Sequence, residues 1–226
     1  MEDLDCVVSL TSWKGRINHP DVPKVIYSII RQKTHYKFKV VLVLSSDEFP
    51  NKDAELPDAL KLFAENGLIE ILWFKENIKA YKKYYPTQLK YKDVPIMTTD
   101  DDIILKQDCI ETFMNAYQKY RCIIYEDGYR FRCSNKDLYI GCVFRLFPPN
   151  SLYELDCSYF TKFFNNVEDD AYLALLVNLK QTPIKYIHSN KMRVLKYSDL
   201  QKVALYNEYR NIDKRICISN LLKELG

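Results

Sequence analysis

Three adjacent aspartates, Asp100, Asp101 and Asp102, have the residue type and spacing that most clearly suggest chemistry in this 226-residue sequence. Residues 94–99 before them are mostly apolar or β-branched, and residues 103–105 are apolar again. Neighbouring carboxylates repel one another unless water solvates them or a divalent cation lies between them. In extended backbone Asp100 and Asp102 point to one face and Asp101 to the other. The run therefore predicts a Mg²⁺ or Mn²⁺ site with Asp100 and Asp102 as ligands, and a solvated acidic turn is the alternative.

A third metal ligand is predicted at His188, which ends a strand-like stretch at 183–188. Two Asp and one His, completed by phosphate oxygens, form a ligand set that suits manganese or magnesium. A lone histidine is more often an ordinary hydrogen-bonded residue, so that alternative stays open.

A second group of acids, Glu168, Asp169 and Asp170, lies in the first turn of a helix-like stretch at 167–179. Acids at this end of a helix complement its dipole and need no further function. A carboxylate held at the edge of a cleft can instead act as a general base that takes the proton of a hydroxyl nucleophile. The residues alone leave both interpretations open.

Lys79, Lys82 and Lys83 lie between the predicted third strand and the aspartates, where they could meet a diphosphate from the side opposite the metal. Tyrosines alternate with these lysines, so the alternative is a solvated helix face. Together with Lys90 and Lys92, the same cluster suggests a secondary interpretation, peripheral association with an anionic membrane face.

The elements that must position these residues alternate between strands and helices in the first half of the chain. Strands are predicted at 6–12, 38–45, 69–74 and 94–99, and helices at 24–33, 58–66 and 79–92. The stretch 38–45 is almost continuously apolar, which is typical of a strand buried on both faces of a parallel sheet. Open α/β sheets bind ligands at the carboxyl ends of their strands, and the aspartates fall at such an end.

The second half of the chain predicts a more open arrangement. Helices are expected at 107–120, 155–164 and 167–179, and polar helices within 198–225. Strands are expected at 121–125, 129–133, 138–147 and 183–188. The first two of these strands form a hairpin whose turn is predicted at Glu126, Asp127 and Gly128.

Composition narrows the class of protein. Hydrophobic residues make up 47% of the chain and aromatic ones 14%, which is enough for the core of one folded domain over residues 1–226. The net charge of +3 comes from 33 Lys and Arg against 30 Asp and Glu, a balance that does not indicate a nucleic-acid partner.

Three further features predict a cytoplasmic protein. The seven cysteines form no CxxC pair, which suggests reduced and mostly buried thiols. No apolar run approaches the roughly 18 residues of a membrane span. The first residues are acidic, whereas a signal peptide begins with basic ones.

Short motifs follow one another along nearly the whole chain up to His188. They are residues 7–12 with 16–17, 28–29 with Gln32, 41–45, 56–57 before Gly67, 98–105, 147–149 and 169–173. As an ordered set they resemble bacterial glycosyltransferases with the GT-A fold, the relatives that build capsular polysaccharide and lipooligosaccharide. The resemblance implies a Rossmann-like α/β fold with a mixed, mainly parallel sheet flanked by helices. It also implies a nucleotide-sugar-binding half over 1–105 and an acceptor-binding half with the catalytic base over 106–226.

The resemblance assigns roles to the two acid groups. In the family an Asp-any-Asp motif binds a nucleotide sugar through a divalent metal, and this motif maps onto Asp100, Asp101 and Asp102. The first acid usually meets ribose or sugar, and the last meets the metal. An acidic pair followed, after two further residues, by Leu173 resembles the catalytic motif, whose second acid is the base, so Asp170 is assigned that role and Asp169 is the fallback.

The resemblance also places residues at the nucleotide. Thr11 and Ser12 lie where the family's first strand meets it, and we assign Arg16 and Ser45 to the same site. Ser45 and the serine after it stand where many relatives have an Asp that binds uracil, and Asp47 is the nearest substitute.

The sequence thus predicts a glycosyltransferase that moves a sugar from a nucleoside diphosphate sugar, expected to be a UDP-sugar, to a hydroxyl of a surface glycan. We expect metal dependence, inversion, and a free or lipid-linked glycan acceptor at the inner face of the membrane. A nucleotidyltransferase is the alternative enzyme, but its usual Gly-rich basic loop is represented only by Lys14, Gly15 and Arg16. A noncatalytic module that binds glycan or membrane is the alternative from another class. The sequence gives no indication of oligomeric state.

Overall fold

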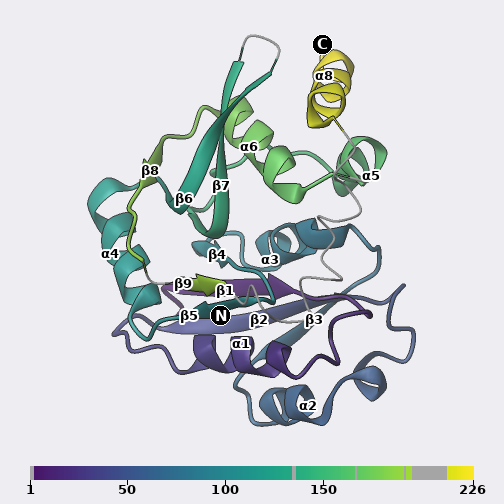
Figure 1. Ribbon diagram of the computed structural model, residues 1–226, viewed down its shortest axis with the longest axis vertical. Helices are drawn as coiled ribbons and strands as arrows, with labels where there is room; N and C mark the ends of the chain where they lie inside the picture. Colours follow the sequence, from purple (N-terminus) through teal and green to yellow (C-terminus); the bar gives the residue numbers. More distant parts are fainter. Residues whose placement is uncertain (1–2, 134–135, 166, 191, 195–212) are drawn as a thin grey trace.

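A seven-stranded mixed sheet runs through the protein in the order β3-β2-β1-β4-β7-β6-β8. The structure is a computed structural model and describes residues 3–133, 136–165, 167–190, 192–194 and 213–226. Figure 1 shows helices on both sides of the sheet. The α/β architecture expected from the sequence is therefore confirmed.

The first four strands are parallel to one another and form the N-terminal half of the sheet. The central strands are apolar and buried almost along their whole length. Both faces of the sheet are therefore covered, as is typical of parallel sheets. The strands are β1 (Cys6–Thr11), β2 (Phe38–Ser45), β3 (Glu70–Phe74) and β4 (Ile96–Thr98).

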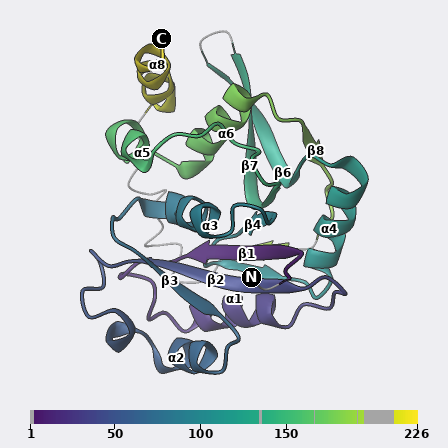
Figure 2. The same cartoon turned by 180° about the vertical axis from the view of Figure 1, so that it is seen from behind.

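Two helices cover one face of these strands, and Figure 1 and Figure 2 both show them on the side opposite α3. Helix α1 (Asp21–Ile30) begins three residues before its predicted start, because Pro23 lies in the first turn, where its missing N–H is not needed. Helix α2 (Asp58–Glu65) follows the short η1 (Lys52–Glu55). It ends just before Gly67, whose φ of +69° is the left-handed conformation that ends many helices.

The helix predicted over 79–92 is instead two short elements, η2 (Lys79–Lys83) and α3 (Tyr85–Lys90). Pro86 explains the break, because proline lacks an N–H and its ring clashes with the carbonyl four residues earlier. The tight turn of η2 directs Lys82 and Lys83 into the protein, where each is only 1% exposed.

In the second half, α4 (Cys109–Tyr120) leads into β6 (Ile123–Cys133), which pairs in antiparallel fashion with β7 (Lys136–Phe147). The turn predicted at 126–128 is wrong, since β6 continues through these residues with only an irregularity after Tyr125. Gly128 is needed for space: a Cβ there would lie 2.1 Å from the Ile140 carbonyl oxygen.

The remaining elements surround this strand pair. Beside β6 and β7 lie α5 (Cys157–Phe164), α6 (Asp169–Lys180) and α8 (Lys214–Glu224), while β8 (Ile184–Tyr186) pairs with β6. A separate two-stranded sheet joins β5 (Ile103–Leu105) to β9 (Met192–Val194). Of the polar tail predicted over 198–225, residues 198–212 lie outside the described residues. None of the described helices combines the length and the apolar character that crossing a membrane requires.

Strand β4 joins the two halves of the sheet, because it pairs in parallel with β1 and in antiparallel fashion with β7. This register places Thr98, the last residue of β4, opposite Arg145 of β7. The aspartate run that follows β4 therefore lies where the N-terminal and C-terminal halves meet. The functional division at residue 105 stays a prediction.

Candidate functional site

The aspartates at the end of β4 bind side chains from the loop after β1. Asp101 accepts a hydrogen bond of 2.6 Å from Arg16 Nη1 and another of 2.6 Å from Ser12 Oγ. Arg16 Nη2 donates to Asp102 at 3.0 Å. Asp101 is 3% exposed, so this part of the run is packed into the protein and does not form a solvated turn.

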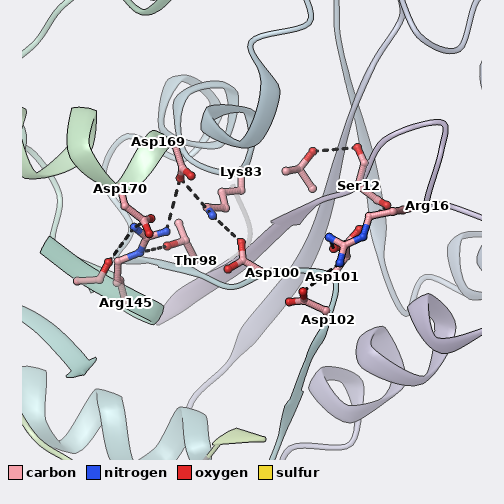
Figure 3. Close-up of polar contacts among 12 residues, drawn as sticks. Ser12, Arg16, Lys83, Thr98, Asp100, Asp101, Asp102, Arg145, Asp169 and Asp170 are labelled. Carbon is pink, nitrogen blue, oxygen red and sulfur yellow. Dashed lines mark hydrogen bonds and ion pairs between the residues drawn. The ribbon is translucent and has the colours of Figure 1, made fainter. Parts of the chain in front are cut away.

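Lys83 joins the aspartate run to the second acid group. Its Nζ donates to Asp100 Oδ1 at 2.6 Å and forms an ion pair of 3.1 Å with Asp169 Oδ2. Burial opposes its charged form, but Asp100 and Asp169 overcome that effect and raise the pKa of Lys83. Figure 3 shows Lys83 between the two carboxylates, which come from residues 69 positions apart in the sequence.

Arg145, a residue of β7, contacts both members of the acidic pair. Its Nη1 donates to Asp170 Oδ1, and its Nη2 lies 3.6 Å from Asp169 Oδ2. Its Nε donates to Thr98 Oγ1 at 3.3 Å, and Nη1 also donates to the Gly141 carbonyl at 3.3 Å. The acids at the start of α6 are therefore bound to the strand pair as well as to η2.

The local backbone leaves room for this arrangement. A Cβ at Gly141 would lie 2.7 Å from atoms of the Tyr125 ring, so a side chain there would push into the sheet beside Arg145. Glu168 lies at the N-cap of α6 with extended backbone, and the next two residues begin the helix. Consecutive helix residues point in different directions, which is why Asp169 faces Lys83 while Asp170 faces Arg145.

The two acids of α6 differ in access to solvent. The side chain of Asp169 is 7% exposed and lies between two cations, whereas that of Asp170 is 27% exposed. Burial raises the pKa of Asp170 to about 6, against the lowering effect of Arg145. A carboxyl group with such a pKa is well matched to general-base catalysis near neutral pH.

Carboxylates and cationic side chains gather at this site. Among the residues that the structure describes, five carboxylates and three cationic side chains form its ion pairs and hydrogen bonds; the residues are Asp100, Asp101, Asp102, Asp169 and Asp170 with Arg16, Lys83 and Arg145. Burial also raises the pKa of Asp101 to about 6, although Arg16 and Ser12 oppose this. Carboxylate oxygens are the ligands that a hard divalent cation prefers, so this cluster offers suitable donors for one.

The predicted three-ligand metal set is not assembled. The described residues contain no group of three His, Cys, Asp or Glu side chains placed to hold one ion. His188 lies beyond β8, where its backbone N–H donates to the Glu126 carbonyl at 3.3 Å and its ring stacks on Tyr186. Asp100 and Asp102 remain a fitting pair, because magnesium is often held by one or two carboxylates together with substrate phosphates. The role of His188 stays a prediction.

Other predicted nucleotide-binding residues form hydrogen bonds with groups other than these carboxylates. Thr11 Oγ1 donates to the Val43 carbonyl at 2.7 Å, and Ser45 Oγ donates to the Lys75 carbonyl at 3.3 Å. Lys82 points away from Lys83 and donates to Glu48 at 2.5 Å. Lys79 is half-buried in the same turn. Lys83 is therefore the lysine of this cluster that reaches the aspartates.

The membrane interpretation of this lysine and tyrosine cluster is weakened. Lys82, Lys83, Tyr81 and Tyr84 are all buried, so these four side chains cannot form an exposed basic and aromatic face. Tyr81 packs against Phe160 and other rings of the C-terminal core instead.

Sequence reasoning missed Arg145, and one signal could have identified it. Arg145 lies within the apolar stretch 138–147, and an arginine in a buried strand is expected to have a carboxylate partner. One acid group was predicted at the carboxyl end of a strand and the other in the first turn of a helix, so either could have supplied that partner.

The sequence matches no protein-family model and no curated protein. Solved structures show the fold. Residues 1–349 of S. aureus TarS align with a TM-score of 0.51 at 12% identity, covering 98% of this chain and 70% of that one. A 4-diphosphocytidyl-2C-methyl-D-erythritol synthase aligns with a TM-score of 0.51 at 11% identity, covering 89% of this chain and 98% of that one. This likeness supports the Rossmann-like GT-A architecture that the sequence predicted.

Replacement of Lys83 by Met is expected to lower the free energy of unfolding by about 3 kcal/mol, because Asp169 would stay buried with one cation fewer. We expect the low end of the range for broken buried ion pairs, since the side chain of Asp100 is 40% exposed and can be rehydrated. Urea unfolding measures the loss. The control is Lys24→Met, which removes an ion pair of a lysine that is 67% exposed and should cost at most about 0.5 kcal/mol. Equal losses in the two variants would contradict the buried role of Lys83.

Proposed function

We propose that this protein is a metal-dependent glycosyltransferase that moves a sugar from a nucleoside diphosphate sugar, a UDP-sugar, to a hydroxyl of a growing surface glycan. One observation supports it most strongly: Lys83 and Arg145 bring the aspartate run of β4 and the acidic pair of α6 into one site. Such a site has groups for both ends of the reaction, the leaving diphosphate and the incoming hydroxyl.

The donor side consists of the aspartate run and Lys83. A divalent cation bound at Asp100 and Asp102 would neutralise charge on the leaving diphosphate. Lys83 is charged and lies beside Asp100, so its Nζ can bind a diphosphate oxygen. Ser12 and Arg16 hold Asp101 and keep the run in place for the donor.

The acceptor side is Asp170. The acceptor hydroxyl gives its proton to a carboxylate oxygen of Asp170 as its oxygen forms a bond to the anomeric carbon. The bond from that carbon to the diphosphate oxygen breaks at the same time, and the nucleoside diphosphate leaves with the bonding electrons. Attack from the face opposite the leaving group inverts the anomeric carbon. Asp169, which is buried between two cations, is the fallback for this role.

The comparisons agree with this proposal at the level of fold, since TarS is a glycosyltransferase. The synthase neighbour has the same fold, so a nucleotidyltransferase is the alternative enzyme. That alternative needs a basic loop free to bind phosphates, but Arg16 is bound to Asp101 and Asp102. We further propose that the acceptor is a free or lipid-linked glycan of the kind found in capsules or lipooligosaccharides, and that the protein acts on the cytoplasmic side of the membrane.

Nucleoside diphosphate binding is expected to raise the melting temperature in a manganese-dependent manner, because a ligand that binds only the folded state stabilises it. Asp102→Asn should remove the manganese dependence, since a neutral amide is a poor ligand for a hard cation. Thermal shift with UDP, with and without MnCl₂, measures both effects. Asp58→Asn, at a fully exposed side chain, is the control and should behave as the natural protein does.

Two outcomes of this thermal-shift experiment would count against the proposal. Absence of any shift with UDP, GDP or CDP, with or without manganese, would favour a noncatalytic module. An unchanged manganese-dependent shift in Asp102→Asn would show that Asp102 is not a metal ligand.

Asp170→Asn is expected to keep donor binding and to lower the rate of sugar transfer about 100-fold to 10,000-fold, which is typical for loss of a general base. In the natural protein kcat/KM should rise with pH through about 6 and then level off, because the base works only after Asp170 loses its proton. A donor screen by nucleotide release identifies the substrate, and pH–rate profiles of Asp169→Asn and Asp170→Asn follow. A large loss confined to Asp169→Asn would move the base by one residue, and normal transfer in both variants would leave these acids as a helix-end feature.

A further inference from the structure

We infer that Arg145 is the positioning residue of this site: it fixes the orientation of the Asp170 carboxylate and keeps that carboxylate ionised for its work as a base. The role of Asp170 as a base rests on the proposed function, but the contacts that support this inference are independent of any substrate. Arg145 is 1% exposed and donates to Asp170 Oδ1 from Nη1.

The guanidinium group of Arg145 donates hydrogen bonds to two uncharged acceptors in addition to its contacts with the acids. Its Nε donates to Thr98 Oγ1 and its Nη1 donates to the Gly141 carbonyl, each at 3.3 Å. These two contacts come from β4 and β7, the strand pair at the centre of the sheet. Because the guanidinium is planar and rigid, these two contacts also set the direction of its other N–H groups. Those groups, on Nη1 and Nη2, point toward Asp170 and Asp169 at the start of α6.

Arg145 and Lys83 therefore differ in what holds them. Lys83 Nζ contacts two carboxylates, those of Asp100 and Asp169, and Asp100 belongs to the donor side. A phosphate oxygen can take the place of such a partner when the donor binds. Arg145 has neutral backbone and hydroxyl partners that no donor would displace, so its contact with Asp170 is kept through the reaction.

Strand register makes this placement specific. Arg145 lies directly opposite Thr98 on one side and opposite Tyr125 of β6 on the other. A shift of one residue in β7 would turn Arg145 to the opposite face of the sheet, away from α6. The position of the base thus depends on the pairing of β4 with β7 as well as on α6 itself.

The charges around Asp170 determine in which direction Arg145 shifts the pKa of this carboxyl group. Arg145 and Lys83 face it as cations, while Asp169 and Asp100 face it as anions. Burial raises the pKa of Asp170 to about 6, and Arg145 is the leading influence that lowers it. Removal of the Arg145 charge should therefore move the pKa of Asp170 upward, so that the carboxylate is protonated at neutral pH.

A carbon-detected NMR titration of the Asp170 carboxyl group tests this in the free protein, without donor or acceptor. In Arg145→Met we expect the pKa of Asp170 to rise by about 1 to 3 units, the usual effect of an opposite charge at close range. In Arg145→Lys we expect a smaller rise, because the charge is kept without the planar contacts. The matched control is Arg130→Met in β6, an arginine that is 66% exposed, and it should leave the pKa unchanged.

Once a transfer assay exists, the same variants should shift the acid limb of the kcat/KM profile by the same amount, with activity recovered at high pH in Arg145→Met. A purely structural role for Arg145 would lower activity at every pH and would not move that limb. If Arg145→Met does not fold, Arg145→Lys decides the question by its titration. A folded variant in which Asp170 titrates as in the natural protein would overturn the inference. Absence of sugar transfer by the natural protein would reject the proposed function, while the titration would still decide whether Arg145 controls Asp170.

Discussion

The buried charges between the two halves of the sheet constrain this structure more than any other feature. Lys83 and Arg145 are each almost fully buried, and burial of an unpaired charge costs several kcal/mol. Asp169 meets both cations from a third element, the start of α6. The three elements η2, β7 and α6 must therefore keep their relative positions, because movement of any one would leave a charge without its partner.

Several local backbone features exist to satisfy this constraint. Pro86 separates η2 from α3 and so allows Lys83 to turn inward, and Gly141 leaves room for the Tyr125 ring beside Arg145. The register of β4 with β7 places Thr98 where it accepts from Arg145. Each feature is local in sequence, but its contribution to the buried charge cluster can be recognised only in the packed structure. The same packing brings together carboxylates that could hold a divalent cation and a lysine that could bind a diphosphate oxygen.

Much of the fold could be predicted from the sequence because its signals are local. The apolar run of β2 has the bounds that its composition predicted, and Gly67 follows α2 as a stop signal should. The hairpin turn at 126–128 was wrong because Gly128 serves a close cross-strand approach, which no local pattern reveals. Pro86 was a visible signal against one helix over 79–92, but its effect on Lys83 depended on tertiary packing.

The candidate site was predictable in its acids and less so in its cations. Asp100, Asp169 and Asp170 stand out by type and position, whereas the choice of Lys83 over Lys82 depends on the direction of two adjacent residues in a tight turn. The side chain of Arg145 bonds to Thr98, which is 47 residues away in the sequence, and to Asp170, which is 25 residues away. Contacts of this range follow from sheet register, which the sequence does not specify by itself. His188 was selected for its residue type and its place at the end of a predicted strand, but among the described residues it forms no three-ligand group with the aspartates.

The most direct test of the central claim is a crystal structure with UDP and Mn²⁺, with the metal located by anomalous diffraction. We predict manganese at Asp100, Asp102 and the diphosphate, with Lys83 Nζ bonded to a diphosphate oxygen and Arg145 still bonded to Asp170. Nucleotide bound away from the aspartate run, or manganese located at other residues, would contradict the account.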